Sequence, residues 1–208
     1  DVYTGNNSVR ELLEIIKEYR VGAVSCRPKS SNSKDSIYGY WANLLTDMAH
    51  LVRKDFVSKN QSISCSGYLY AIKKGIVRSI PENNLYDDAV ISYIISKKGY
   101  FVSYAEKAEV YVKFPTNFKD WIAQKKRSTG GYNQMKYLGM EEKRKMRSLK
   151  EEIFGIFKVL RYPSSLKEMY WTLLLILARV YLWMMIYKDI NLKKKEFGKV
   201  WVRIESTK

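Results

Sequence analysis

The chain has few of the residues on which many hydrolases and metalloproteins depend, because its 208 residues include two cysteines and one histidine. Cys26 and Cys65 lie in separate apolar segments, without the Cys-x-x-Cys spacing of a zinc or redox site. We therefore expect both thiols to be reduced and buried. His50 would have to serve alone in any Ser-His-Asp or Cys-His mechanism. It lies in a mainly apolar helical run, which favours a packing or surface role.

The chain is neither depleted of apolar residues nor balanced in charge. Hydrophobic residues make up 46% of it, enough for one ordinary domain with a modest appendage. The net charge is +16, and residues 116–208 hold 21 basic and 9 acidic side chains, whereas residues 1–115 hold 16 and 12. The second part therefore faces an anionic partner, and both nucleic acid and an anionic membrane surface fit that description.

An apolar stretch favours the membrane over nucleic acid. Met169–Tyr187 is about as long as a bilayer-spanning helix, and Arg179 is its single charge. A central arginine costs on the order of 3 kcal/mol on insertion scales, which apolar neighbours can offset. A spanning helix, a helix in the membrane interface and a buried helix of a soluble domain all remain open.

The residues before this stretch predict a basic amphipathic helix. Apolar side chains recur at near-helical spacing over Leu149–Arg161, among several lysines and arginines. Pro163 then breaks the helix, and Lys193-Lys194-Lys195 follows the apolar stretch. We expect a domain over residues 1–135, an amphipathic interface region over 136–168, a membrane helix over 169–190 and a basic tail over 191–208.

Residues 1–115 predict alternating helices and short strands, which favours an α/β domain. Ser8–Glu11 has the pattern of a capping box that opens a helix, and Gly99 follows a predicted helix as its C-cap. The other expected elements are a strand over Val21–Cys26, a helix over about Tyr38–Val57, a strand around Tyr68–Ile72, a helix from Asp87 or Asp88 to about Ser96, and paired strands over Tyr100–Tyr104 and Glu109–Lys113.

Two clusters carry the chemistry. Asp87-Asp88 lies at a predicted helix start, and Gln124-Lys125-Lys126-Arg127 follows beyond the two short strands. Taken alone, an aspartate pair at a helix start is usually an N-cap with favourable dipole placement, and the basic cluster is a solvated helix face. The order of the two clusters along the chain, however, is part of a wider pattern.

Four segments together carry a resemblance to a known family. In order, they are Arg20–Ser25 after the opening Asp1-Val2-Tyr3, Cys65–Lys74, Asp87–Ser92 with Lys98–Val102, and Gln124–Arg127 near Gly130-Gly131. On these residues, about 1–135 of the chain resembles the carboxy-terminal half of a family 2 glycosyltransferase with the GT-A fold. This group includes cellulose synthase-like and hyaluronan synthase-like enzymes. The resemblance implies an α/β, partial GT-A domain followed by amphipathic and membrane-associated helices.

The resemblance also implies roles for individual residues. Asp88 matches the catalytic base, and Asp1 matches the second carboxylate of a metal-binding Asp-x-Asp that would hold Mn²⁺ or Mg²⁺. The chain departs from the family pattern at two positions. Asp87 stands where the family usually has Glu, and Ser128 stands where a Trp is expected to support processive polymer synthesis. The implied substrate-binding residues are Asp87, Gln124, Arg127, Lys126, Gly67 and Tyr68.

The implied function is inverting transfer of a sugar from a nucleotide-sugar donor to a glycan or lipid-linked acceptor. The expected location is the membrane, with the catalytic domain on its cytoplasmic side and no nucleic-acid partner. The family binds the nucleotide with amino-terminal strands, so we expect that half to be absent and the chain alone to be inactive. A non-catalytic membrane scaffold of the same fold and a basic nucleic-acid-binding module are the alternatives.

Overall fold

A computed structural model of the chain describes residues 2–81, 86–137, 155, 157–191 and 207. A mixed sheet forms its centre, in the strand order β1-β4-β2-β3. The two long strands, β2 (Val21–Ser30) and β4 (Phe101–Val112), are parallel, while β1 (Val2–Thr4) and β3 (Tyr70–Ile72) are short and antiparallel to their neighbours. This arrangement confirms the expected α/β class.

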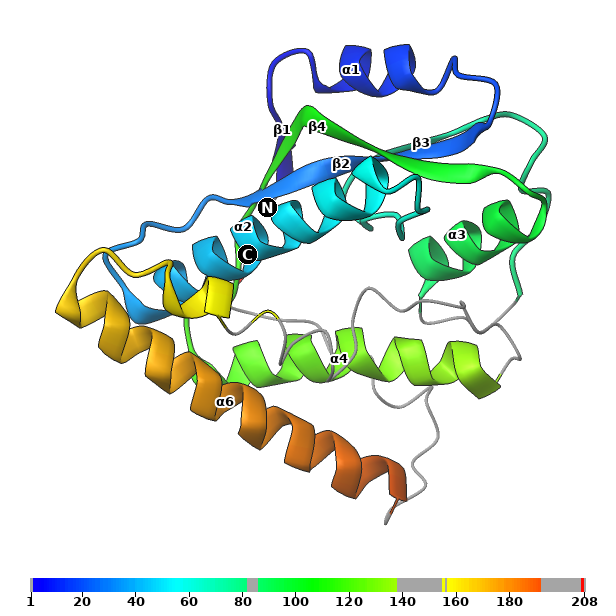
Figure 1. The fold of residues 1–208 in the computed structure, drawn as a ribbon. Coiled ribbons are helices and arrows are strands. Elements are labelled where there is room, and N and C mark those ends of the chain that lie inside the picture. The colour runs from blue at the N-terminus through cyan, green and yellow to red at the C-terminus, as the bar shows by residue number, and fades with distance from the viewer. Residues whose placement is uncertain (1, 82–85, 138–154, 156, 192–206, 208) are drawn as a thin grey trace.

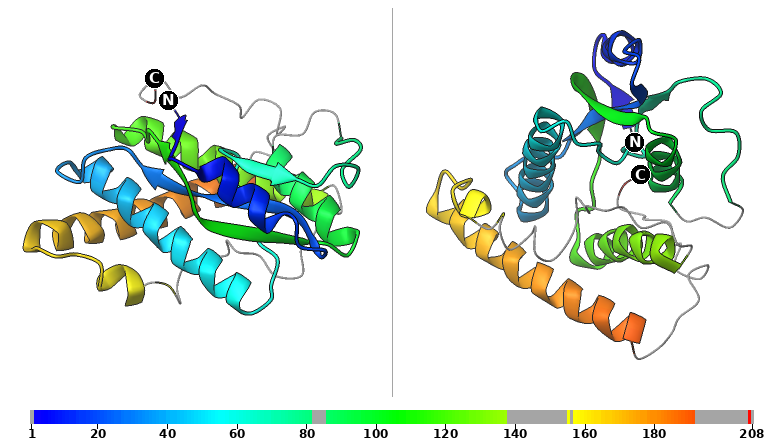
Figure 2. Two further views of the ribbon diagram at one scale, coloured as in Figure 1. Left: turned by 90° about the horizontal axis from the view of Figure 1, so that it is seen from above. Right: turned by 45° about the vertical axis from the view of Figure 1, so that its right-hand side comes forward.

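Helices cover both faces of the sheet (Figures 1 and 2). One face carries α1 (Ser8–Ile15), and the other carries α2 (Ile37–Ser58) and α3 (Asp87–Lys97). Beyond α2 and α3 lies a further layer of α4 (Phe118–Tyr137) and α6 (Leu166–Asn191), which contact each other. The apolar core is correspondingly divided between the α1 face, the α2–α3 face and the junction of α2, α4 and α6.

Two sequence expectations about strands were wrong. The predicted pair Tyr100–Tyr104 and Glu109–Lys113 is one continuous strand, β4, because β2 lies parallel to it on both sides of residues 105–108. The pairing of β2 with β4 changes register between Val21 and Ala23 and between Ser25 and Arg27, and both strands continue past these two points. Strand β2 also extends to Ser30 instead of ending at Cys26, since Pro28, Lys29 and Ser30 all pair with β4.

The predicted capping box was wrong as well, although α1 begins where expected. The N-cap is Asn7, in the left-handed region with φ 64°, and its side chain makes no capping bond. Ser8 is buried instead, with Oγ 2.9 Å from the carbonyl oxygen of Gly5 and 2.7 Å from that of Glu109. The hydroxyl therefore links α1 to β4. Gly99, with φ 80°, does follow α3 as predicted.

The cysteine prediction is confirmed, because Cys26 and Cys65 are free and buried. Burial raises the pKa of the Cys26 thiol to about 11 and that of the Cys65 thiol to about 12. His50 packs on β4, where its Nδ1 lies 2.8 Å from the hydroxyl oxygen of Tyr104. Neither the thiols nor the histidine is arranged for catalysis.

Within the described residues, α6 is the one helix long and apolar enough to cross a membrane. That segment runs over Leu166–Lys188, with a mean hydropathy of 1.7 and 28% of it buried in the molecule. By itself this is a weak indication of membrane association, since a core helix of a soluble protein can pass the same test. Most of the predicted amphipathic helix and the basic tail lie outside the described residues.

Candidate functional site

A cleft of about 510 Å³ opens between α2, the segment before β3, the start of α3 and α4. Six of the residues expected to bind substrate or catalyse transfer line it. They are Gly67, Tyr68, Asp87, Asp88, Gln124 and Arg127. These residues come from three separate parts of the chain. The tertiary structure therefore brings together most of the site that the sequence implied.

The segment that forms one wall of the cleft is fixed by buried hydrogen bonds. The backbone N–H of Cys65 donates to Ser92 Oγ at 2.8 Å, and the N–H of Ser66 donates to Ser25 Oγ at 2.8 Å. Ser92 Oγ in turn donates to the carbonyl oxygen of Asp88 at 2.6 Å. One serine thus connects the wall to the first turn of α3, and its full burial makes the connection rigid.

Asp88 lies at the amino end of α3, where the helix dipole favours a negative charge. Its Oδ1 accepts the N–H of Ala89 at 2.8 Å. Its Oδ2 lies beside Gly67, so close that a Cβ on that glycine would lie 3.2 Å from it. The absence of a side chain at Gly67 therefore leaves the second carboxylate oxygen room beside the wall.

An aromatic hydroxyl lies near this carboxylate pair. Tyr70 lines the cleft, and burial raises the pKa of its phenol. The negative charges of Asp88 and Asp87 raise that pKa further. Tyr70 therefore remains protonated at neutral pH and can donate a hydrogen bond within the cleft.

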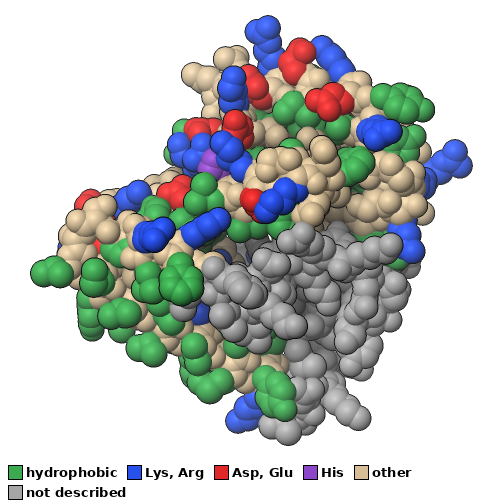
Figure 3. Space-filling model, viewed as in Figure 1, with side chains coloured by type: hydrophobic (Ala, Val, Ile, Leu, Met, Phe, Trp, Pro, Cys, Tyr) green, Lys and Arg blue, Asp and Glu red, His purple; other side chains and the backbone are tan. Residues whose placement is uncertain are grey.

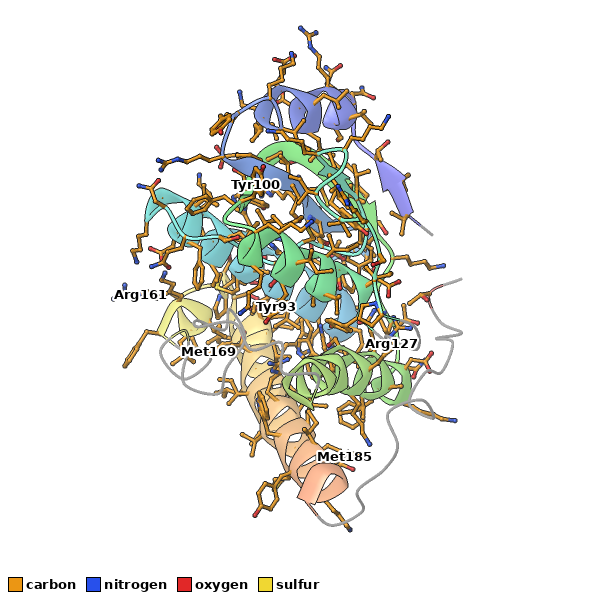
Figure 4. The ribbon with its side chains drawn as sticks, turned by 90° about the vertical axis from the view of Figure 1, so that its right-hand side faces the viewer. Tyr93, Tyr100, Arg127, Arg161, Met169 and Met185 are labelled. Carbon is orange, nitrogen blue, oxygen red and sulfur yellow. The ribbon has the colours of Figure 1, made fainter. Side chains whose placement is uncertain are left out.

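Helix α4 supplies the opposite wall. Gln124, Lys125, Arg127 and Ser128 line the cleft from it, together with Trp121. Figure 4 shows Arg127 on the side of α4 that is turned toward α2 and α3. The Gln124 Oε1 atom is buried and has no hydrogen-bond partner among the described residues. A buried acceptor of this kind favours a ligand that can donate a hydrogen bond to it.

Two of the implied site residues do not join this group. Lys126 is half-buried but is not among the residues that line the cleft, whereas its neighbour Lys125 is. The helical repeat explains the difference, because Gln124 and Arg127 share a face of α4 from which position 126 is turned away. Asp1 lies outside the described residues.

Sequence reasoning missed Arg53, which lines the cleft although it is only 7% exposed. It follows Ala42, Thr46 and Ala49 along α2, and these three residues also line the cleft. The spacing of these four residues places them on one face of the helix, and small side chains on a helix face leave room beside it. That pattern is visible in the sequence and could have indicated this wall.

The described residues do not by themselves form a full metal site. No group of three or more His, Cys, Asp and Glu side chains that could hold an ion occurs among residues 2–81, 86–137 and 157–191. Mg²⁺ usually takes only one or two protein carboxylates and completes its shell with water and substrate phosphates. The prediction of a divalent cation at Asp1 therefore stays a prediction.

The comparison with known families shows the family of the chain. The model of the family described as glycosyl transferase family group 2 matches residues 4–188, which include every described wall of the cleft. The chain belongs to this family. Membership in the glycosyl transferase group establishes a transferase that uses a sugar donor and an acceptor. No curated protein matches the chain.

An aspartate pair at a helix start is common, and family membership alone does not assign it a role. The cleft holds both charge signs, with Asp87 and Asp88 from α3 and Arg53, Lys125 and Arg127 from α2 and α4. Such an arrangement can take a proton at one side and stabilise an anionic group at another.

Proposed function

We propose that the chain transfers a hexosyl group from a nucleotide-sugar donor to a hydroxyl of a glycan or lipid-linked acceptor, with inversion at the anomeric carbon. The grouping of Asp88, Gly67, Gln124 and Arg127 around a single cleft supports this proposal most strongly. Polysaccharide biosynthesis is the process that such a transfer would serve.

Asp88 is the proposed base. Its carboxylate takes the proton of the acceptor hydroxyl as that oxygen forms a bond to the anomeric carbon. The bond between that carbon and the diphosphate oxygen breaks, and its electron pair leaves with the nucleoside diphosphate. Gly67 keeps the wall beside the carboxylate free of a side chain, and Tyr68 and Asp87 border the acceptor.

Cationic and polar side chains on α4 take the opposite role. Arg127 stabilises the negative charge that develops on the departing diphosphate, through charge-assisted hydrogen bonds. Lys125 is better placed than Lys126 to assist it, because Lys125 lines the cleft. The buried Gln124 Oε1 accepts a hydrogen bond from a sugar hydroxyl. A divalent cation near Asp1 would supply further charge neutralisation when bound.

We further propose that the protein acts at a membrane, with this cleft on the cytoplasmic side. The apolar helix α6 and the excess of basic residues after residue 115 support this location. The family resemblance implies that amino-terminal strands of the GT-A fold bind the nucleotide.

The test is turnover of nucleotide sugars by the full-length protein in membranes, with Mg²⁺ or Mn²⁺ present. Nucleotide release and the anomeric configuration of the product are measured for the unsubstituted protein and for Asp88→Asn. Removal of a general base typically costs about a hundredfold or more in kcat. We therefore expect at least that loss in Asp88→Asn, with substrate binding retained and an inverted product from the unsubstituted protein.

Asp55→Asn is the matched control, because Asp55 pairs with Lys59 at 2.7 Å on the exposed end of α2, away from the cleft. It should leave kcat unchanged. Turnover that does not depend on Asp88 would contradict its role as base. Absence of turnover with every common nucleotide sugar, in correctly folded protein, would favour the scaffold alternative instead.

A further inference from the structure

Helix α6 presents a continuous apolar face to the outside of the molecule. Apart from Lys167, the exposed side chains from Leu166, which is 84% exposed, to Tyr187, which is 69% exposed, are apolar or aromatic. Soluble monomers rarely expose an apolar patch this long. Figure 3 shows hydrophobic side chains gathered along the lower left edge, over α6. The outward face consists of Leu166, Met169, Tyr170, Leu173, Leu177, Val180, Tyr181, Met184 and Tyr187.

The inner face of the same helix is docked on the domain by directional contacts. Trp41 Nε1 of α2 donates to the carbonyl oxygen of Trp171 at 2.7 Å, and the Tyr40 hydroxyl lies 2.7 Å from Thr172 Oγ1. Just before α6, the Tyr162 hydroxyl donates to Asp47 Oδ2 at 2.8 Å. These hydrogen bonds specify one position of α6 against α2, which apolar packing alone would not do.

The docked stretch covers more than half of the helix. Its buried residues run from Thr172 through Leu175, Ala178 and Leu182 to Ile186, a rise of about 21 Å at 1.5 Å per residue. They share one apolar cluster with Tyr40, Trp41 and Leu44 of α2 and with Trp121 and Ile122 of α4. The helix therefore lies along the domain and does not project from it (Figure 2).

This packing is incompatible with a helix that crosses the membrane. The hydrocarbon layer is about 30 Å thick, so a spanning α6 would place most of its docked stretch inside it. Its partners α2 and α4 would then enter the hydrocarbon too, with Lys125, Arg127 and the cleft that they line. Charged side chains are costly there, and a water-accessible cleft could not form.

We propose that α6 lies in the plane of the membrane surface, docked on the domain, with its outward face inserted at the boundary of headgroups and acyl chains. The proposed partner is the surface of an anionic bilayer. This inference deepens the proposed function, since it rests on action at a membrane. It replaces the open choice between a spanning and an interfacial helix with the interfacial one.

The charges around α6 fit that partner. Lys167 and Lys188 are exposed near the two ends of the outward face, and Lys158 and Arg161 are exposed just before the helix. Basic side chains beside an inserted apolar face are typical of interfacial helices on anionic lipid. Arg179, half-buried at the middle of the helix, would lie near the headgroups in this orientation and at the bilayer centre in a spanning one.

The inference links the membrane to the cleft. Trp121 lines the cleft and packs in the same cluster as the buried residues of α6. Phe118, one turn before it, contacts the ring of Tyr181 with the centroids 6.1 Å apart. An in-plane α6 would therefore hold α4 and the cleft at a fixed height above the lipid surface, which suits an acceptor carried in the membrane.

The test uses the full chain with both Lys167→Cys and Lys188→Cys, two exposed positions that flank the ends of the inserted face, reconstituted in sealed vesicles of phosphatidylcholine and phosphatidylglycerol. A maleimide that cannot cross the bilayer is added outside, and intact-mass spectrometry counts labels per molecule. An in-plane helix has both ends on one side, so each molecule should carry two labels or none. A spanning helix has its ends on opposite sides, so each molecule would carry one, which would overturn the proposal.

Two controls complete the design. The unsubstituted protein should carry no label, because Cys26 and Cys65 are buried. The double variant Leu173→Glu, Leu177→Glu should reduce vesicle binding by roughly tenfold or more, since it places charge on the inserted face. Val9→Glu with Leu13→Glu, on the exposed side of α1, should leave vesicle binding unchanged.

Two further outcomes are decisive. The double-cysteine variant is also labelled in solution without lipid. A stable dimer whose two introduced cysteines do not react with the maleimide there would overturn the proposal in favour of a second copy as the partner. Label counting requires no turnover, so the two proposals can fail separately. An active transferase with one label per molecule would refute only the in-plane helix, and two labels on an inactive protein would refute only the transfer.

Discussion

Gly67 lies directly beside the carboxylate of Asp88, where an added Cβ would come within 3.2 Å of Oδ2. Such a contact is tighter than ordinary van der Waals packing, so the carboxylate must shift by a few tenths of an ångström. Small displacements of a catalytic group can cost about tenfold to a hundredfold in rate. We therefore expect Gly67→Ala to lower kcat by about tenfold while the melting temperature changes little.

Gly155→Ala is the matched control, because no described residue lies within 4 Å of a Cβ placed there. Steady-state kinetics and thermal unfolding of both variants check the prediction. An unchanged kcat in Gly67→Ala would mean that the position of the Asp88 carboxylate does not limit the reaction.

Ser92 connects the cleft wall to α3, and its loss should loosen both. Ser92→Ala removes the acceptor for the buried N–H of Cys65 and the donor to the carbonyl of Asp88. An unsatisfied buried polar group costs about 1–3 kcal/mol, so the free energy of unfolding should fall by about that amount. Ser58→Ala, at the exposed end of α2, should change it by less than about 0.5 kcal/mol.

Denaturant titration measures these changes, and hydrogen exchange locates them. The amide of Cys65 should exchange faster in Ser92→Ala than in the unsubstituted protein. If the exchange of that amide is the same in both, Ser92 does not hold the wall to α3.

Both thiols should be inert while the protein is folded. Burial raises the pKa of Cys26 to about 11, and burial together with the charge of Asp88 raises that of Cys65 to about 12, so neither forms a thiolate at neutral pH. We expect a disulfide reagent to modify neither thiol until denaturant is added. Ser58→Cys, with an exposed side chain, should react at once, and equally fast reaction of Cys65 would show that the cleft wall opens in solution.

His50 should make the fold sensitive to mild acid. Burial, followed by the charges of Arg27 and Lys54, lowers its pKa below the ordinary value of 6.5. The unfolded chain therefore binds the proton first as the pH falls, and the contribution of His50 to stability is present above pH 6.5 and lost below it. The melting temperature of the unsubstituted protein should fall more between pH 7.5 and pH 5 than that of His50→Gln.

His50 is the single histidine of the chain, so its ring protons can be titrated directly by NMR. A midpoint at or above 6.5 in the folded protein would contradict the prediction, whatever the melting temperatures show.

The α/β class and most helices follow from local sequence pattern. The errors in the predicted strands concern β2 and β4, whose extent depends on their pairing with each other. The apolar periodicity of α2 and the glycine after α3 act within a few residues, so the sequence reveals them. The continuity of β4 depends on pairing with β2, and residues 105–108 carry no local sign of it. Ser8 resembles an N-cap in sequence, but tertiary contact with Glu109 gives its hydroxyl a different role.

The candidate site divides in the same way. Asp88, Gln124 and Arg127 were predicted to meet in one site because their motifs resemble those of a family, and all three line the cleft. The family model that matches residues 4–188 shows that the chain belongs to the group. Lys125 could not, since a basic residue on a helix has no distinctive pattern until the facing wall is known. Arg53 was missed, although the small residues Ala42, Thr46 and Ala49 on its face of α2 give a pattern that the sequence shows. Lys126 was included from its place in the motif, and the rotation of α4 leaves it outside the lining of the cleft.

By itself, the sequence determined the class of domain, the presence of a carboxylate and a Gln-x-x-Arg cluster, the inert thiols and an apolar segment near residue 180. These features follow from composition, periodicity and short motifs, which can be read without knowing which distant residues make contact. Only the tertiary structure decided which side chains meet in the cleft and which face of α6 stays exposed. The reason is that hydrogen bonds such as that from Trp41 to Trp171 join residues far apart in the chain, and only folding brings them together.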